Sequence, residues 1–187
     1  MLNEAELIKE CIRHQRSAQY ALYERYSPVM LSVCMRYSKN IEEAEDLLQE
    51  GFLKVFDKIA TFRGQGSLEG WIRRIMINHA LNALKAKKLI FLDEDPQRLS
   101  EFLPDDPPDG EEELYPPEMM MKAVQELPEG YRIVFNLYVF EELSHKEIAD
   151  TLNISENTSK SQLSRARRHL RNNLVNRIKD EQNGAIK

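Results

Sequence analysis

The chain has 187 residues, of which 42% are hydrophobic and 30% are charged, and its formal net charge is −5 at pH 7. This composition is typical of a soluble globular protein with one domain or two small ones. No apolar run is long enough for a membrane span and no secretory signal opens the chain, so we expect a cytoplasmic protein. Its two cysteines, Cys11 and Cys34, lie among apolar neighbours and are expected to be buried, reduced thiols.

Helical periodicity is strong from the first residues onward and strand signals are weak, which predicts an all-α fold. Apolar spacing predicts a short helix over residues 4–16 and a second helix that Ser17 caps. A further helix is expected to begin at Pro28 with Ser27 as its cap, because proline suits the first helical turn. The tyrosines of this region are expected at the edges of the core.

Residues 40–59 form the clearest amphipathic pattern of the first half. Asn40 is placed to cap the helix, with Glu43 at the third position. The apolar stripe comprises Ala44, Leu47, Leu48, Phe52, Val55, Phe56 and Ile59. The opposite side carries Glu42, Glu43, Glu45, Asp46, Gln49 and Glu50. Acidic residues near a helix N-terminus are favourable in themselves, so this side is either a solvated surface or a docking face for a basic partner.

A polar loop over residues 61–67 leads to a helix that Ser67 caps and that runs to about residue 88. Its expected core residues are Leu68, Ile72, Ile75 and Ala83. The other sides carry Trp71, Arg73, Arg74, Asn78, His79, Asn82, Lys85, Lys87 and Lys88. Residues 71–88 contain five basic residues and no acidic one, and a cationic helix with an aromatic and an amide suits unstacked bases. The tryptophan fits a core position equally well, and His79 has no neighbour that would make it a metal ligand.

Residues 93–118 differ sharply in composition, with eleven acidic residues, six prolines and one arginine. Such a segment cannot bury enough apolar surface to fold, so it is expected to be an extended, mobile linker. It divides the chain into two helical domains.

The second domain is expected to contain four helices. The first begins at Pro117 and ends by Pro128, and the second spans residues 129–141. Their expected core residues are Met120, Val124, Leu127, Ile133, Val134, Leu137 and Phe140.

The last two helices have clear boundaries. Ser144 and Glu147 form a capping box, Asn153 suits a left-handed helix stop, and Ser155 is placed to cap the final helix. The apolar positions are Ile148, Ala149 and Leu152, followed by Leu163, Ala166, Leu170 and Leu174. Residues 157–179 hold seven Lys or Arg and no Asp or Glu. Two helices, a tight turn and a basic second helix predict a helix-turn-helix for DNA, against the alternative of an ordinary helical hairpin with a solvated basic face.

The order of these blocks closely resembles bacterial sigma factors of the extracytoplasmic-function branch. The resemblance rests on the blocks AEDLLQE, GWIRRI followed by Asn78, and KSQLSRAR, and it covers nearly the whole chain outside the linker and the last dozen residues. It implies a protein, not an enzyme by itself, that binds core RNA polymerase, recognises promoter DNA through two elements and helps to open the duplex. No cofactor or metal is implied, and whether an anti-sigma factor binds both domains stays open.

The resemblance also implies site residues and domain boundaries. Polymerase contacts are expected from Asp46, Gln49 and Glu50, and minus-ten contacts from Trp71, Arg73, Arg74, Asn78 and Lys85. Minus-thirty-five contacts are expected from Asn157, Thr158, Lys160, Ser161, Ser164, Arg165 and Arg168. The expected parts are residues 1–92 for polymerase and minus-ten binding, 93–117 as linker, 118–180 as the minus-thirty-five domain, and 181–187 as a tail.

Three residues depart from the family pattern. Asn157 stands where family members usually have Gly, and Asn82 replaces a usual Asp. Ser159 stands where the family usually has Val, so a hydroxyl occupies a position that normally buries an aliphatic group.

Two other functions are considered. A two-domain helix-turn-helix regulator would bind an operator without core polymerase, and it would need neither the acidic helix nor the Trp71 to Asn78 block. An enzyme is the remaining class, but the sequence shows no nucleophile and base pair, no metal-ligand spacing and no phosphate loop.

Overall fold

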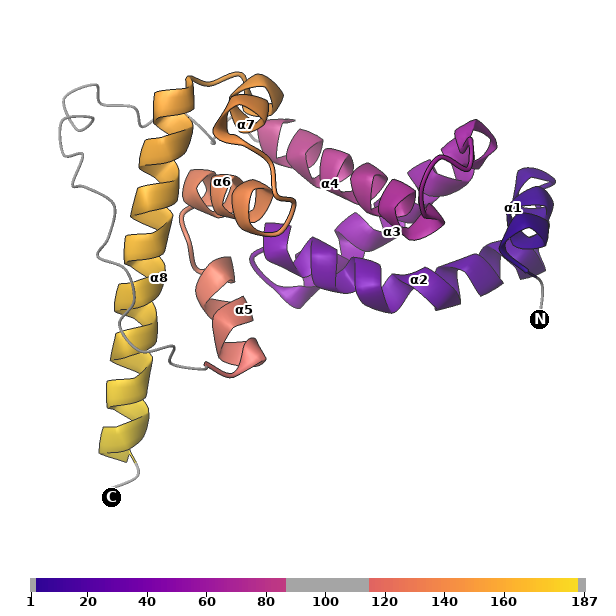
Figure 1. Cartoon of the computed structure of the whole chain (residues 1–187). Helices are drawn as coiled ribbons and strands as arrows, with labels where there is room; N and C mark the ends of the chain where they lie inside the picture. Colours follow the sequence, from indigo (N-terminus) through magenta and orange to yellow (C-terminus); the bar gives the residue numbers. More distant parts are fainter. Residues whose placement is uncertain (1–2, 87–114, 185–187) are drawn as a thin grey trace. The chain divides into compact units, whose positions relative to one another are not determined.

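A computed structural model describes residues 3–86 and 115–184, and the regular elements within these ranges are all helical (Figure 1). The chain divides into two compact units, Met1–Ala86 and Lys87–Lys187. The predicted all-α fold with two helical domains is therefore confirmed. Residues 93–114 of the predicted linker and the last three residues of the predicted tail lie outside the described residues. None of the helices described combines the length and apolarity needed to cross a membrane.

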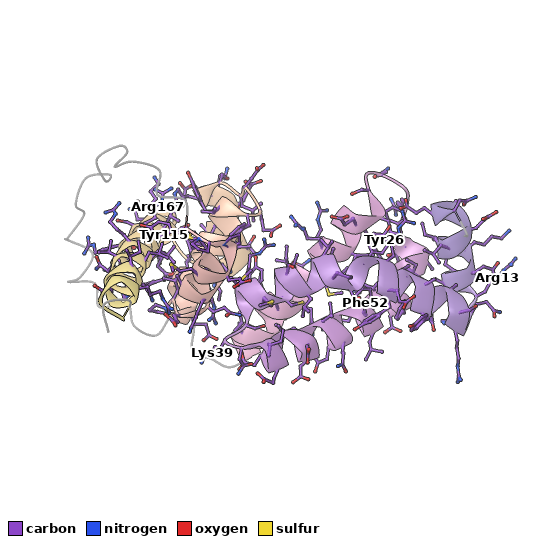
Figure 2. All side chains as sticks on the ribbon, turned by 90° about the horizontal axis from the view of Figure 1, so that it is seen from below. Arg13, Tyr26, Lys39, Phe52, Tyr115 and Arg167 are labelled. Carbon is purple, nitrogen blue, oxygen red and sulfur yellow. The ribbon has the colours of Figure 1, made fainter. Side chains whose placement is uncertain are left out.

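The first unit contains α1 (Glu4–Ile12), α2 (Arg16–Tyr37), α3 (Ile41–Lys58), the short 3-10 turn η1 (Ile59–Thr61) and α4 (Leu68–Ala86). Helices α2, α3 and α4 pack against one another, and α1 packs on α2 and η1. The aromatic centre of this core is Phe52, whose ring lies 4.8 Å from Tyr23 and 6.0 Å from Phe56 between centroids (Figure 2).

Helix α2 corrects the predicted break at Ser27 and Pro28. It is one continuous helix of 22 residues with Pro28 inside it. The buried residues Ala18, Leu22, Tyr26, Met30 and Cys34 recur every four residues through the proline. Proline removes one backbone donor from the helix, but Pro28 lies on the exposed side, where water can satisfy the freed carbonyl. Burial of the stripe on both sides of Pro28 outweighs the lost hydrogen bond. The N-cap is Gln15, so Ser17 does not cap α2, and α1 ends at Ile12 rather than at residue 16.

Two predicted caps in the first unit are confirmed. The side chain of Asn40 accepts from the backbone N–H of Glu43 at 2.8 Å, and Ser67 Oγ accepts from the N–H of Gly70 at 3.1 Å. Both cysteines are buried and free, as expected, and burial raises the pKa of the Cys34 thiol to about 12.

The predicted core face of α4 is partly wrong. Leu68 and Ile72 are fully buried, but Ile75 and Ala83 are half-buried. His79, predicted to lie on the surface, is buried. Packing against both α2 and α3 widens the buried face of α4 beyond a single stripe. Its further buried apolar residues are Met76, Ile77, Ala80, Leu81 and Leu84.

The second unit contains α5 (Pro117–Gln125), α6 (Glu129–Val139), α7 (His145–Leu152) and α8 (Glu156–Gly184). The long α8 packs against the other three helices. The predicted α8 stripe of Leu163, Ala166, Leu170 and Leu174 is buried.

Two predicted core positions of this unit differ in the structure. Met120 is half-buried, and Phe140 is 38% exposed. Phe140 is the C-terminal cap of α6, and Phe135, five residues earlier in the helix, is the buried phenylalanine. The two rings meet edge to face with centroids 6.0 Å apart.

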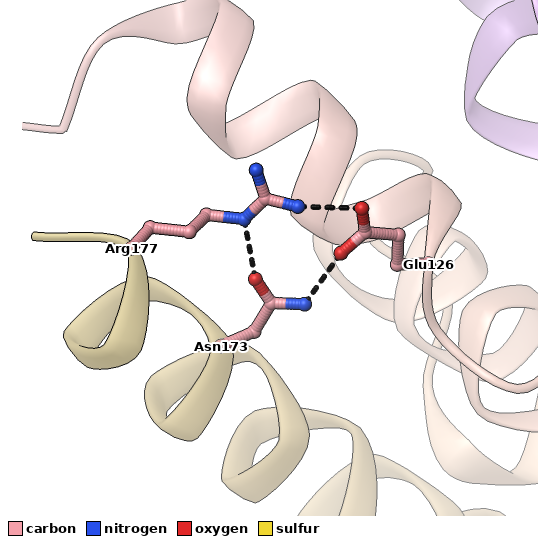
Figure 3. A network of polar contacts seen from close by, with 3 residues as sticks. All are labelled: Glu126, Asn173 and Arg177. Carbon is pink, nitrogen blue, oxygen red and sulfur yellow. Dashed lines mark hydrogen bonds and ion pairs between the residues drawn. The ribbon is translucent and has the colours of Figure 1, made fainter. Parts of the chain in front are cut away.

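Polar contacts connect the end of α5 to the middle of α8 (Figure 3). Asn173 Nδ2 donates to Glu126 Oε2 at 2.6 Å, and Arg177 Nε donates to Asn173 Oδ1 at 2.6 Å. A nitrogen of the Arg177 guanidinium also donates to the other oxygen of Glu126. This triad connects a part of α8 well beyond its first turns to the rest of the unit.

Candidate nucleic-acid interface

The turn between α7 and α8 has the predicted helix-turn-helix geometry. Ser144 and Glu147 form the capping box at the start of α7. Asn153 ends α7 in the left-handed conformation, with φ 56° and ψ 51°. Ser155 Oγ then accepts from the N–H of Thr158 at 3.0 Å and so caps α8. Each of these residue types satisfies backbone groups that the helix ends leave unpaired, which fixes where α8 starts.

The first three turns of α8 present one polar face, which we call the recognition face. Its members recur at intervals of three and four residues, so they share one side of the helix. Asn157, Lys160, Ser164 and Arg168 are exposed, and Ser161 and Arg165 are half-buried. Ser161 Oγ donates to the carbonyl of Thr158 at 3.0 Å, which leaves its lone pairs free to accept.

Thr158 does not belong to the recognition face. It is 5% exposed, and its hydroxyl lies 2.8 Å from Ser155 Oγ within the cap of α8. The side chain of Thr158 is therefore not counted in the recognition face, because it is buried and its hydroxyl contacts Ser155.

The unusual Ser159 is fully buried, and its hydroxyl has a partner. Ser159 Oγ lies 2.9 Å from Nδ1 of His145, the first residue of α7. The His145 ring stacks on Tyr138 of α6, with centroids 4.8 Å apart. Burial lowers the pKa of His145, and the charges of Lys160 and Arg167 lower it further, so the ring is neutral at pH 7. A polar pair thus replaces the aliphatic contact expected at this position.

The ring of Tyr138 also makes a cation–π contact with an arginine. The guanidinium carbon of Arg167 lies 5.8 Å from the Tyr138 centroid (Figure 2 labels Arg167). Arg167 itself is exposed, next to the recognition face on α8. Helices α6, α7 and α8 are therefore connected by one chain of contacts, Arg167 to Tyr138 to His145 to Ser159.

The exposed side of α4 brings together most of the residues expected to contact the minus-ten element. Trp71, Arg74 and Asn78 recur at spacings of three and four residues and share one face. Trp71 is half-buried against Phe62, with ring centroids 5.5 Å apart, so it is neither fully core nor fully surface. Arg73 is half-buried on another side of the helix. Lys85 belongs to α4, but its side chain lies outside the described residues.

Asp46, Gln49 and Glu50 are exposed on one side of α3, and we call them the acidic face. Leu53 lies one turn beyond on the same side and is 67% exposed. Acidic side chains around an exposed leucine suit a partner that offers both basic and apolar groups.

Sequence reasoning missed a residue behind this face. His79 of α4 lies between Glu50 and Lys54 of α3, with Nδ1 2.7 Å from Lys54 Nζ and Nε2 3.0 Å from Glu50 Oε2. The sequence did contain a signal for this contact. His79 follows Ile72 and Met76 at helical spacing, so it shares their buried side of α4. The segments are 25 residues apart, so only the packing of α3 on α4 reveals the contact.

Comparisons with known proteins give both units the same family. The model of Sigma-70 region 2 matches residues 22–90, and the model of Sigma-70, region 4 matches residues 118–170. RNA polymerase sigma factor SigV of Bacillus subtilis is 31% identical over 135 residues, which cover 72% of this chain and 78% of SigV. ECF RNA polymerase sigma factor SigW of the same organism is 29% identical over 176 residues, which cover 89% of this chain and 94% of SigW.

A solved structure has a similar fold. It is the sigma factor RpoE in complex with the anti-sigma factor NepR from Bartonella quintana, with a TM-score of 0.51 and 21% identity, covering 83% of this chain and 96% of that chain. The two matched regions follow in order on the two helical units. The chain therefore belongs to the extracytoplasmic-function branch of the sigma-70 family, the sigma factors that bind core RNA polymerase and direct it to promoters.

Proposed function

We propose that the two units of this sigma factor bind different partners and promoter elements. Residues 1–92 bind core polymerase through the acidic face and contact the minus-ten element through α4. Residues 118–180 bind the minus-thirty-five element through the recognition face, residues 93–117 link the two, and residues 181–187 are a tail. The protein works in the cytoplasm, where RNA polymerase acts. An anti-sigma factor is a further partner that the family resemblance suggests.

The observation that carries this proposal is the segregation of exposed charge onto separate helices. Acidic side chains gather on α3, whereas the exposed side of α8 offers Lys160, Arg168 and polar groups without an acidic residue after Glu156 in its first turns. Phosphates require cations, and base edges require donors and acceptors projecting from one face of a helix. The recognition face meets both requirements, whereas the acidic face offers no cation to the phosphates.

The α4 face suits single-stranded rather than duplex DNA. Trp71 offers a ring held by Phe62, Arg74 offers a cation, and Asn78 offers an amide that both donates and accepts. Reading a base away from its stack needs a surface of this kind. Strand opening would therefore create the ligand that α4 binds.

The polymerase contact is tested by reversing charge on α3. Asp46→Arg is expected to abolish binding to core polymerase while the protein stays folded, because an exposed substitution changes stability by only about 0.5 kcal/mol. Asp150→Arg, a charge reversal at an exposed site of α7 in the other unit, is the control. The measurement is co-elution with core polymerase. If the Asp46 variant is folded by circular dichroism and still co-elutes, α3 does not carry the contact.

The base-reading role of α8 is tested by Arg165→Ala. A base-directed arginine is worth about 1–3 kcal/mol of discrimination, so run-off transcription from the cognate promoter should fall more than affinity for scrambled duplex. Lys122→Ala, which removes one exposed charge from α5, is the control and should leave discrimination unchanged. An equal loss on all sequences would assign Arg165 to the phosphates instead.

A gel-shift titration separates this proposal from an operator-binding regulator. The free protein is expected to bind duplex promoter weakly and with little sequence preference, since α4 lacks its single-stranded ligand. Its complex with core polymerase is expected to bind the promoter specifically. Tight and selective binding by the free protein would support the regulator, which the family comparisons do not favour.

A further inference from the structure

The side chain of His79 is buried between two oppositely charged side chains of the neighbouring helix. It is 6% exposed, whereas the side chain of Glu50 is 65% exposed. Glu50 and Lys54 are four residues apart on α3, with the acid on the N-terminal side, which is the favoured arrangement for a direct ion pair. In the structure the imidazole of His79 lies between them and contacts each at about hydrogen-bond distance.

The chemistry of the three groups fixes the state of the ring. A lysine ammonium has only donors, so Nδ1 of His79 accepts from Lys54 through its lone pair. The ring proton is then on Nε2, which faces Glu50 Oε2 at 3.0 Å. This second contact is an electrostatic one between a polar N–H and a carboxylate.

A close approach of the two helices makes room for this arrangement. Gly51 follows Glu50 directly, and a Cβ at Gly51 would lie 2.2 Å from the Sδ atom of Met76. Met76 comes one turn before His79 on α4. With any larger residue in place of Gly51, the Met76 side chain or the helices would have to shift.

We propose that His79 is a positioning residue for polymerase binding: it holds Lys54 away from Glu50, so that the Glu50 carboxylate stays available on the acidic face. Without the imidazole, Lys54 would pair with Glu50 along the helix and neutralise a charge that a basic partner requires. This inference rests on the proposed polymerase contact of the acidic face. It adds a residue of α4 that touches neither polymerase nor DNA.

Protonation would undo the arrangement. Burial lowers the pKa of His79, and Lys54 lowers it further against the opposing effect of Glu50, so the ring is neutral at pH 7. Lys54 and Glu50, both on α3, are the charged groups that act on the ring. Uptake of a proton at acid pH removes the lone pair that holds Lys54 and places a positive charge beside Glu50. Affinity for a basic partner is therefore expected to fall on acidification.

The test compares two substitutions in the full-length protein. His79→Leu fills the space without polar contacts, and His79→Gln keeps an amide that can accept from Lys54. At about pH 7.5 we expect the leucine variant to bind core polymerase three- to tenfold more weakly than wild type, as for other coupled contacts, and the glutamine variant to bind like wild type. A residue with only a packing role would give the opposite order, because leucine suits an apolar core better.

A double-mutant cycle with Glu50→Gln shows whether His79 acts through Glu50. We expect His79→Leu to cost no further affinity once Glu50 is Gln. An equal loss in both backgrounds overturns the inference, as does a folded leucine variant with wild-type affinity while Glu50→Gln binds weakly. If Glu50→Gln itself binds like wild type, the proposed contact of Glu50 fails and this inference fails with it.

A third measurement, the affinity for core polymerase as a function of pH, tests the inference even if the leucine variant does not fold. As pH falls from about 6.5, the usual histidine pKa, toward the lower pKa of the buried His79, wild-type affinity should fall relative to that of His79→Gln. A constant ratio of the two affinities over this range overturns the inference.

Discussion

The two helical units of this sigma factor bury different kinds of side chain. In the first unit, Ser38 and His79 are the buried polar residues among those described, and the core is aliphatic and aromatic around Phe52. The second unit buries fewer hydrophobic residues than the first, and it buries five polar residues. These are Arg132, Asn136, Thr158, Ser159 and Gln162.

This difference indicates two ways of placing a functional face. Apolar burial is strong but non-directional, and it holds α3 and α4 against α2 whatever charges their exposed sides carry. Buried polar groups must find partners in fixed directions, so they specify one arrangement and penalise others. In the second unit the position of α8 therefore depends on particular atoms, such as the Ser159 hydroxyl and Nδ1 of His145.

The strongest test of this contrast removes the aromatic centre of the first unit. Phe52→Ala is expected to destabilise that unit by about 3–5 kcal/mol, the usual cost for a fully buried phenylalanine. Trp71 is the single tryptophan of the chain and lies in the first unit, so its fluorescence follows that unit alone. In urea, the fluorescence transition should move to lower concentration while the part of the helical signal that belongs to the second unit does not move. A fluorescence midpoint equal to wild type would contradict the assignment of Phe52 as the centre.

The second unit should instead be sensitive to a single hydroxyl. Ser159→Ala removes the part-buried hydrogen bond to Nδ1 of His145, which is expected to cost about 0.5–1.5 kcal/mol. The measurement is urea unfolding followed by circular dichroism, with Ser164→Ala, an exposed site on the same helix, as the control. If both variants unfold like wild type, the Ser159 contact does not stabilise the unit.

Most of the helix caps could be predicted from sequence alone, although Ser17 and Ser27 cap no helix. The caps at Asn40, Ser67, Ser144 and Ser155 and the left-handed Asn153 all lie where the sequence placed them. Each depends on a side chain within a few residues of the backbone groups that it satisfies. The acidic face and the recognition face also follow from helical spacing, because exposure of one side is the complement of an apolar stripe.

What sequence could not predict depends on contacts between distant segments. Pro28 reads as a helix start, and only burial of the stripe on both sides of it keeps α2 continuous. His79 reads as a surface residue until α3 is packed on α4. The hydroxyl of Ser159 reads as a packing defect, and its partner His145 is 14 residues away on another helix. The part that the Thr158 hydroxyl plays in the cap of α8 was also not predicted.

Acid should weaken the second unit through His145. Burial holds the folded-state pKa of His145 below its usual value of 6.5, so as pH falls the unfolded chain takes up the proton first. The stabilising contribution is complete above about pH 6.5, and it is lost as pH falls through that value toward the lower pKa of the folded state. Unfolding free energies from circular dichroism should therefore decline over this window. His145→Gln should be less dependent on pH there, and an identical pH profile in this variant would show that another group is responsible.

The smallest effect is expected from the ion pair at the far end of the second unit. The hydrogen bonds from Arg177 and Asn173 hold the pKa of Glu126 below its usual value of 4.5. Its contribution is therefore present above about pH 4.5 and is lost as pH falls through that value toward the lower folded-state pKa. Because the Glu126 side chain is 41% exposed, solvent screens the pair, and Glu126→Gln should cost only about 0.2–1 kcal/mol at pH 7. The difference between wild type and variant should shrink in high salt and vanish at strongly acid pH. A difference that persists at acid pH would mean that Glu126 acts through packing on α8 rather than through its charge.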